Sequence, residues 1–218
     1  MNPATPSLTG FLVAAATAAS VACGPAVAAQ SAPPIVRPGA PGQPSEVIDA
    51  AKAATLSHPT FTAADVKFMQ GMIGHHAQAL EMVELLKSRT ASDDMKKLAQ
   101  RIDLSQRDEM KMMRDWLQTR GAETPGEHAH HDPTMRMPGM LTPEEMNGLA
   151  AARGEAFDKL FLEHMIGHHE GALVMVRQLF ATPGAGQESE IYTFASDVEA
   201  DQRMEIARMA GMLKELQK

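Results

Sequence analysis

The sequence has almost no cysteine and few aromatic residues. Its one cysteine, Cys23, lies in the N-terminal segment, so no disulfide within the chain can stabilise the fold. Aromatic residues make up only 4% of the chain, and strand-forming residues are scarce. Ala, Leu, Met, Glu, Gln and Lys predominate, and these residues lose little side-chain freedom in a helix. The composition therefore predicts an all-α protein.

Positive charge and catalytic motifs are also lacking. The formal net charge is −7, whereas a nucleic-acid-binding protein needs Lys and Arg to neutralise phosphates. The chain contains no G-x-S-x-G motif and no glycine-rich loop of the kind that binds phosphates. We therefore expect neither a nucleic-acid partner nor an enzyme.

The N-terminal segment contains an apolar run over residues 10–22, followed by Ala26-Val27-Ala28. This pattern predicts a secretory signal peptide over residues 1–28. The run is too short and too rich in Ala to predict a transmembrane helix. The mature chain is then expected in the periplasm or otherwise exported, without a membrane span and without a thiol. Lipid anchoring through Cys23 is the minor alternative.

The rest of the chain divides by composition. Residues 29–60 are rich in Pro, Ala and Gly, which predicts a flexible leader with a short helical turn around residues 46–56. The domain proper is expected over residues 61–218, with a His/Met-rich loop at 121–141. Capping patterns at Thr62 and Thr142 indicate helix starts. Long helices are predicted over residues 62–87, 92–117, 155–180 and 187–216.

An internal repeat organises these helices. Met72-Ile-Gly-His-His76 recurs 93 residues later as Met165-Ile-Gly-His-His169. A second match relates Gln106 and Glu109 to Gln202 and Glu205, so a two-helix unit occurs twice. Each hairpin has an apolar stripe that it cannot bury alone. Two such hairpins predict a ferritin-like four-helix bundle.

The repeat also carries metal-binding chemistry. Helical residues three and four positions apart share a face, so Met72 neighbours His75 and His76. Imidazole and thioether together suit copper, and thioether favours Cu(I), with Cu(II) as the alternative oxidation state. The candidate ligands on the two helices are Met72, His75, His76, Met82, His164, Met165, His168, His169 and Met175.

A second, looser set of candidates lies in the central loop. His-rich tracts commonly bind metals, and a segment that is ordered only on binding should hold them weakly. These loop candidates are His128, His130, His131, Met135 and Met137. In the helical set, the recurring Glu and Gln residues are either hydrogen-bond partners of the imidazoles or simply solvated positions.

Two other functions remain open. One is a metal-dependent oxidase on a ferritin-like bundle, although a di-iron oxidase needs Glu-x-x-His on its core helices. The residues three positions before the helical histidines are Met, Ile and Phe, and none is a carboxylate. The other is a structural or partner-binding helical module, in which Met and His only pack the core.

Residues 68–80 and 157–173 resemble the domain of unknown function 305, a bacterial ferritin-like four-helix family. The resemblance extends over roughly residues 60–217. It implies an exported protein that binds copper through Met and His side chains. We expect such a protein to act in sequestration, resistance or delivery of copper. A copper transporter or chaperone would then be a partner. The positions that match the family motif are Met72, His75, His76, Met165, His168 and His169.

Overall fold

The computed structural model describes residues 33–37, 44–54, 59–126 and 137–217. The chain divides into two units, residues 1–56 and 57–218, which are described separately. The expected signal peptide with Cys23, and the loop candidates His128, His130, His131 and Met135, lie outside the described residues.

The first unit contains a small antiparallel pair of strands. β1 (Ile35–Arg37) pairs with β2 (Glu46–Ile48), and α1 (Ala50–Ala54) follows. The helical turn expected around residues 46–56 is therefore present, but it begins later, and the strands were not predicted. Ile35 faces Ile48 in the pairing and Val36 faces Val47. Such β-branched pairs stabilise antiparallel strands even within a segment rich in Pro and Gly.

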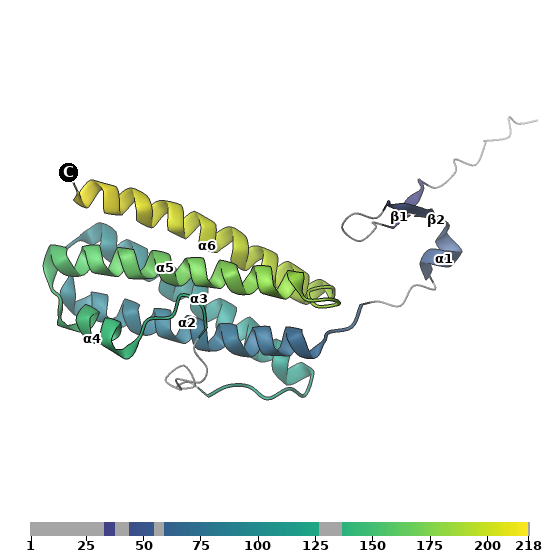
Figure 1. Ribbon diagram of the computed structural model, residues 1–218, viewed down its shortest axis with the longest axis horizontal. Coiled ribbons are helices and arrows are strands. Elements are labelled where there is room, and N and C mark those ends of the chain that lie inside the picture. The colour runs from purple at the N-terminus through teal and green to yellow at the C-terminus, as the bar shows by residue number, and fades with distance from the viewer. Residues whose placement is uncertain (1–32, 38–43, 55–58, 127–136, 218) are drawn as a thin grey trace, which may run out of the picture. The chain divides into compact units, whose positions relative to one another are not determined.

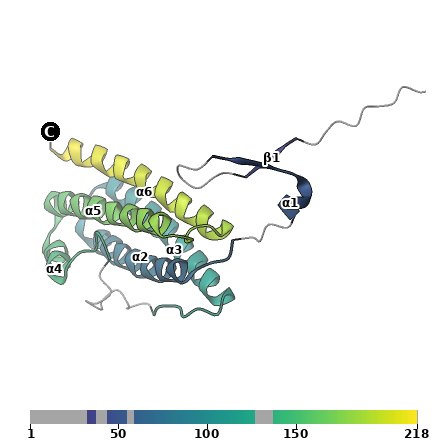
Figure 2. The ribbon, with the colours of Figure 1, turned by 45° about the vertical axis from the view of Figure 1, so that its right-hand side comes forward.

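In its described residues the second unit is a bundle of four long helices, as predicted, with one short helix in addition. α2 lies against α3, α5 lies against α6, and the two hairpins meet where α2 packs on α5 (Figures 1 and 2). None of the described helices is both long enough and apolar enough to span a membrane. The helices are α2 (Ala63–Arg89), α3 (Asp93–Thr119), α4 (Pro143–Ala151), α5 (Gly154–Ala181) and α6 (Ser189–Leu216).

The helix starts follow the capping signals in the sequence. Thr62 forms a capping box with Asp65, and Thr142 forms a second one with Glu145. Asp65 is fully buried, and its second carboxylate oxygen accepts a hydrogen bond of 2.7 Å from the backbone N–H of Gly186. This contact fixes the start of α2 to the turn between α5 and α6.

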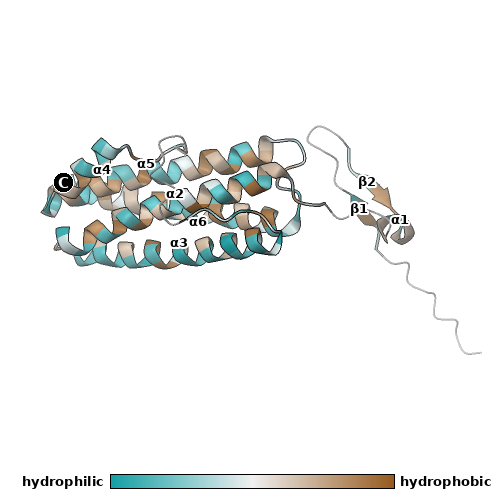
Figure 3. Ribbon diagram, turned by 90° about the horizontal axis from the view of Figure 1, so that it is seen from below, coloured by the Kyte–Doolittle hydropathy of each residue, from teal (hydrophilic) through white to brown (hydrophobic). Residues whose placement is uncertain are grey.

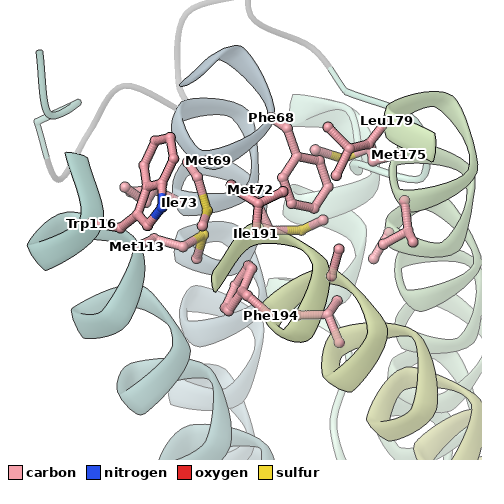
Figure 4. Packing of buried hydrophobic residues seen from close by; sticks show 14 of the residues in the cluster. Phe68, Met69, Met72, Ile73, Met113, Trp116, Met175, Leu179, Ile191 and Phe194 are labelled. Atoms are coloured by element: carbon pink, nitrogen blue, oxygen red, sulfur yellow. The ribbon is translucent and has the colours of Figure 1, made fainter. Parts of the chain in front are cut away.

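The core of the bundle consists of two apolar clusters. The Phe68 cluster joins the first half of α2 to the second half of α5, and Figure 4 shows its side chains converging. The Phe161 cluster joins the second half of α2 to the first half of α5. The two helices are therefore antiparallel. Figure 3 shows that α3 is largely hydrophilic, since only one stripe of it faces the core.

Candidate metal centre

A layer of polar residues separates the two apolar clusters. On each long helix polar residues interrupt the buried apolar stripe at the level where the Phe68 cluster ends and the Phe161 cluster begins. We call these residues the histidine layer. They are His75 and His76 on α2, Gln106 and Glu109 on α3, His168 and His169 on α5, and Gln202 and Glu205 on α6.

At the centre of this layer His75 and His168 lie ring against ring. Their ring centroids are 3.8 Å apart with an interplanar angle of 37°, and each residue is only 1% exposed. Burial lowers the pKa of His75 to about 3, with a further lowering from His76. Burial and the neighbouring His75 lower the pKa of His168 well below its usual value. Both rings are therefore neutral and can donate a lone pair to a metal.

The second histidine of each pair is held by a carboxylate. His76 Nε2 donates to Glu109 Oε2 over 2.5 Å, and His169 Nε2 donates to Glu205 Oε2 over 2.7 Å. These two contacts are equivalent in the repeat. The partner role considered for the recurring glutamates is thus present in the structure. A proton on Nε2 leaves Nδ1 of a neutral imidazole with its lone pair.

The layer is rich in buried polar atoms without a hydrogen-bond partner. Among the described residues, eight buried side-chain nitrogen and oxygen atoms lack one, and seven belong to this layer. Buried polar atoms are normally paired, and each exception needs an explanation. The unpaired nitrogens of the four imidazole rings are explained if these rings are metal ligands, whereas they are not explained if the rings only pack the core. The seven atoms are Nδ1 of His75, His76, His168 and His169, Nε2 of His168, and Oε1 of Gln106 and Gln202.

Two pairs of buried methionines flank the layer. Met72 and Met175 belong to the Phe68 cluster, whereas Met82 and Met165 belong to the Phe161 cluster. The repeat relates Met72 to Met165 and Met82 to Met175, so the two pairs are equivalent. Figure 4 shows the sulfur-bearing side chains of Met72 and Met175 within the same cluster. Thioethers thus lie on both sides of the imidazoles.

A short segment covers one side of the layer, and sequence reasoning missed it. Residues 137–141, here named the strap, place the carbonyl of Pro138 3.1 Å from His75 Nε2. Because a carbonyl only accepts, Nε2 of His75 carries the proton and Nδ1 has the lone pair. Gln78 holds the strap at both backbone groups of Leu141, accepting from its N–H over 2.7 Å and donating to its carbonyl over 3.0 Å.

Two glycines allow the strap to approach α5. A Cβ at Gly171 would lie 2.0 Å from the Pro138 carbonyl oxygen, and one at Gly139 would lie 2.6 Å from the Gly167 oxygen. Gly139 also has a φ of 79°, which L side chains rarely adopt. A glycine inside a helix can signal such a close approach, so Gly171 was the available clue.

The structure separates the remaining candidates. His164 is half-buried, and among the described residues no hydrogen bond or ring contact joins it to the histidine layer. Met137, one of the predicted loop ligands, is partly buried and packs against the Phe68 cluster. Within the described ranges no three His, Cys, Asp or Glu side chains converge as a metal site.

The α3–α6 side of the layer is acidic. Burial, followed by the charges of Glu109 and Glu205, raises the pKa of Asp201. Arg101 balances this charge in part, since its Nε lies 3.8 Å from Glu205 Oε1. Negative charge thus gathers beside His76 and His169, which favours a bound cation.

Fold and centre together define a class of protein: a bundle of two repeated helical hairpins whose core is crossed by paired histidines between paired methionines. The chain belongs to the DUF305 family, a domain of unknown function, which it matches over residues 65–213. No curated protein matches the chain.

Solved structures of the same family share the fold. A DUF305 protein from Streptomyces coelicolor is 28% identical with a TM-score of 0.62, over 70% of this chain and 93% of that one. A DUF305 fragment from Deinococcus radiodurans is 34% identical with a TM-score of 0.61, over 72% and 99%. CopM in its Cu(II)-bound form is 27% identical with a TM-score of 0.57, over 69% and 96%. CopM has also been solved with Cu(I) and with silver.

Proposed function

We propose that this chain is an exported copper-binding protein that holds Cu(I) at the histidine layer. The observation that carries the proposal is the buried pair of His75 and His168, whose Nδ1 atoms have no partner in the core. Equivalent methionine pairs on either side supply the soft ligands that Cu(I) prefers. The copper-bound and silver-bound states of CopM, a structural relative, support the choice of metal.

The role is sequestration, resistance or delivery of copper, without turnover. A site of imidazoles and thioethers needs no cysteine, so it remains competent in an oxidising compartment. The Streptomyces coelicolor relative is described as secreted, which supports export. Delivery would require a copper transporter or chaperone as the partner. Cleavage after Ala28 is part of the same proposal, and N-terminal sequencing of the exported protein tests it.

Metal analysis of protein purified from its native compartment tests the binding role. We expect copper to remain bound after extensive dialysis, and we expect the His75→Ala/His168→Ala double variant to lose most of it. His164→Ala is the matched control, because His164 is on the same helix as His168 but outside the layer. Equal copper in the wild type and the double variant would refute the proposal.

Oxygen uptake separates a binder from a metal-dependent oxidase. With excess Cu(I) under air, a binder protects the bound ion and consumes no oxygen beyond the rate of free copper. Sustained uptake that depends on His75 and His168 would instead establish an oxidase.

A further inference from the structure

The strap brings a methionine against the bundle beside the histidine layer. It is held there by backbone contacts, since the Pro138 carbonyl accepts from His75 and both backbone groups of Leu141 bind Gln78. Within the strap, the N–H of Met137 donates to the sulfur of Met140 over 3.4 Å. The position of Met137 is therefore fixed by the fold.

Met137 and Met175 converge on the same point of α2. A Cβ at Gly71 would lie 3.4 Å from Met175 Cε, 3.7 Å from Met137 Cγ and 4.0 Å from Met137 Sδ. The two thioether side chains thus line the same space beside Gly71, each within van der Waals contact of the place where a Cβ at position 71 would lie. Gly71 is four residues before His75, so this space lies on the same face of α2 as the imidazole.

The two methionines differ from the deeper candidates in exposure. Met137 is half-buried and Met175 is 7% exposed, whereas Met72 is fully buried and His75 and His168 are each 1% exposed. A buried metal site needs an access route. The space above Gly71 is a part-exposed location lined by two soft ligands, one helical turn from His75.

We propose that Met137 and Met175 form a second, thioether-only site for a soft monovalent cation, through which the metal passes to His75 and His168. Thioethers select Cu(I) and similar soft ions over hard ones. The metal is that of the proposed function, on which this step rests. The strap therefore supplies a ligand and is not only a cover over the imidazoles.

The site can be observed directly with Ag(I) as the probe. The full chain is labelled with 13C at the methionine methyl groups, and the Met137 and Met175 signals are assigned from Met137→Leu and Met175→Leu. We expect both signals to shift together as Ag(I) is added, and the Met175 shift to be reduced in Met137→Leu. The signal of Met204, which is 53% exposed on α6, should not move. Unmoved Met137 and Met175 signals in protein that binds Ag(I) would overturn the proposal.

The rate at which Cu(I) loads into the protein shows whether Met137 of the strap acts as a metal ligand or whether the strap only covers the histidine layer. We expect Met137→Leu to slow the transfer of Cu(I) from a chromophoric chelator to the buried site. Gly171→Ala, whose Cβ would meet the Pro138 oxygen at 2.0 Å, displaces the strap and should also slow loading. A strap that only covers the site predicts the reverse, with faster loading in Gly171→Ala and no change in Met137→Leu. Met204→Leu is the control with the same number of methionines removed.

The two proposals fail in different ways. If wild-type protein binds neither Ag(I) nor Cu(I), the proposed function is wrong and the strap site falls with it. If binding depends on His75 and His168 but is indifferent to Met137 in both experiments, only the strap site is wrong.

Discussion

His75 and His168 come from equivalent positions of two repeated helices and meet with their ring centroids 3.8 Å apart in the core of the bundle. Neither ring has a partner for its Nδ1 atom. Burying unpaired polar groups costs stability, so packing alone gives no reason for the pair. A bound metal that accepts the lone pairs of both rings gives such a reason.

The carboxylates behind the second histidines should tune the affinity. Replacing Glu109 and Glu205 with Ala removes the groups that orient His76 and His169, and such partners typically contribute about 10–100-fold to metal affinity. We expect a loss of that size in a Cu(I) competition titration. Glu199→Ala is the control, since Glu199 is on α6 and pairs only with Arg203 among its described contacts. An unchanged affinity in the double variant would show that these carboxylates serve the fold alone.

The metal-free protein should lose stability as the pH falls. The pKa of His75 is lowered to about 3 and that of His168 is also lowered, while unfolded histidine binds a proton near about pH 6.5. As the pH falls, the unfolded state therefore binds protons before the folded state does. Below about pH 6.5, His75 and His168 each lower the free energy of unfolding by up to about 1.4 kcal/mol per pH unit. Urea unfolding between neutral pH and about pH 4 measures the slope.

Variants identify the groups responsible for this slope. We expect His75→Leu/His168→Leu to show a flatter pH dependence than the wild type, and His164→Leu to keep the wild-type slope. Parallel curves for the wild type and the double variant would mean that the buried pair does not control acid stability.

The strap should contribute measurably to stability through Gln78. Gln78→Ala leaves the N–H of Leu141 buried without its partner, which costs about 1–3 kcal/mol. A shift of the urea midpoint and faster hydrogen exchange at Leu141 are the expected results. Gln70→Ala is the matched control, because Gln70 makes a similar bond to the Glu123 carbonyl at an exposed position. If the two variants were equally stable, the strap would be only loosely attached.

Much of the fold could be predicted because it depends on local signals and on the repeat. Thr62 and Thr142 start helices as their capping patterns indicate, and the internal repeat predicted two helical hairpins packed as a four-helix bundle. The contact of His76 with Glu109 was one of two open alternatives, since spacing on separate helices does not fix which side chains touch.

Other features depend on contacts that no local pattern encodes. The strap approaches α5 because Gly139 and Gly171 lack side chains. Met137, at the start of the strap, packs against the Phe68 cluster, which its place in the predicted loop did not indicate. His164 shares the helix and the spacing of the other candidates, yet it lies outside the layer. The lowered pKa of His75 arises from burial, whereas the sequence alone gives the ordinary value.

The most direct test of the account is a competition titration of Cu(I) against a chromophoric chelator. The proteins compared are the wild type, His75→Ala/His168→Ala and Met72→Leu/Met165→Leu, with His164→Ala and Met204→Leu as controls. The methionine changes nearly conserve volume and usually cost less than about 1.5 kcal/mol, and circular dichroism verifies the fold of each variant. We predict that both double variants bind Cu(I) more weakly, the histidine variant most of all, while both controls retain wild-type affinity. Wild-type affinity in both double variants would contradict the account and would mean that the histidine layer and its methionines are packing alone.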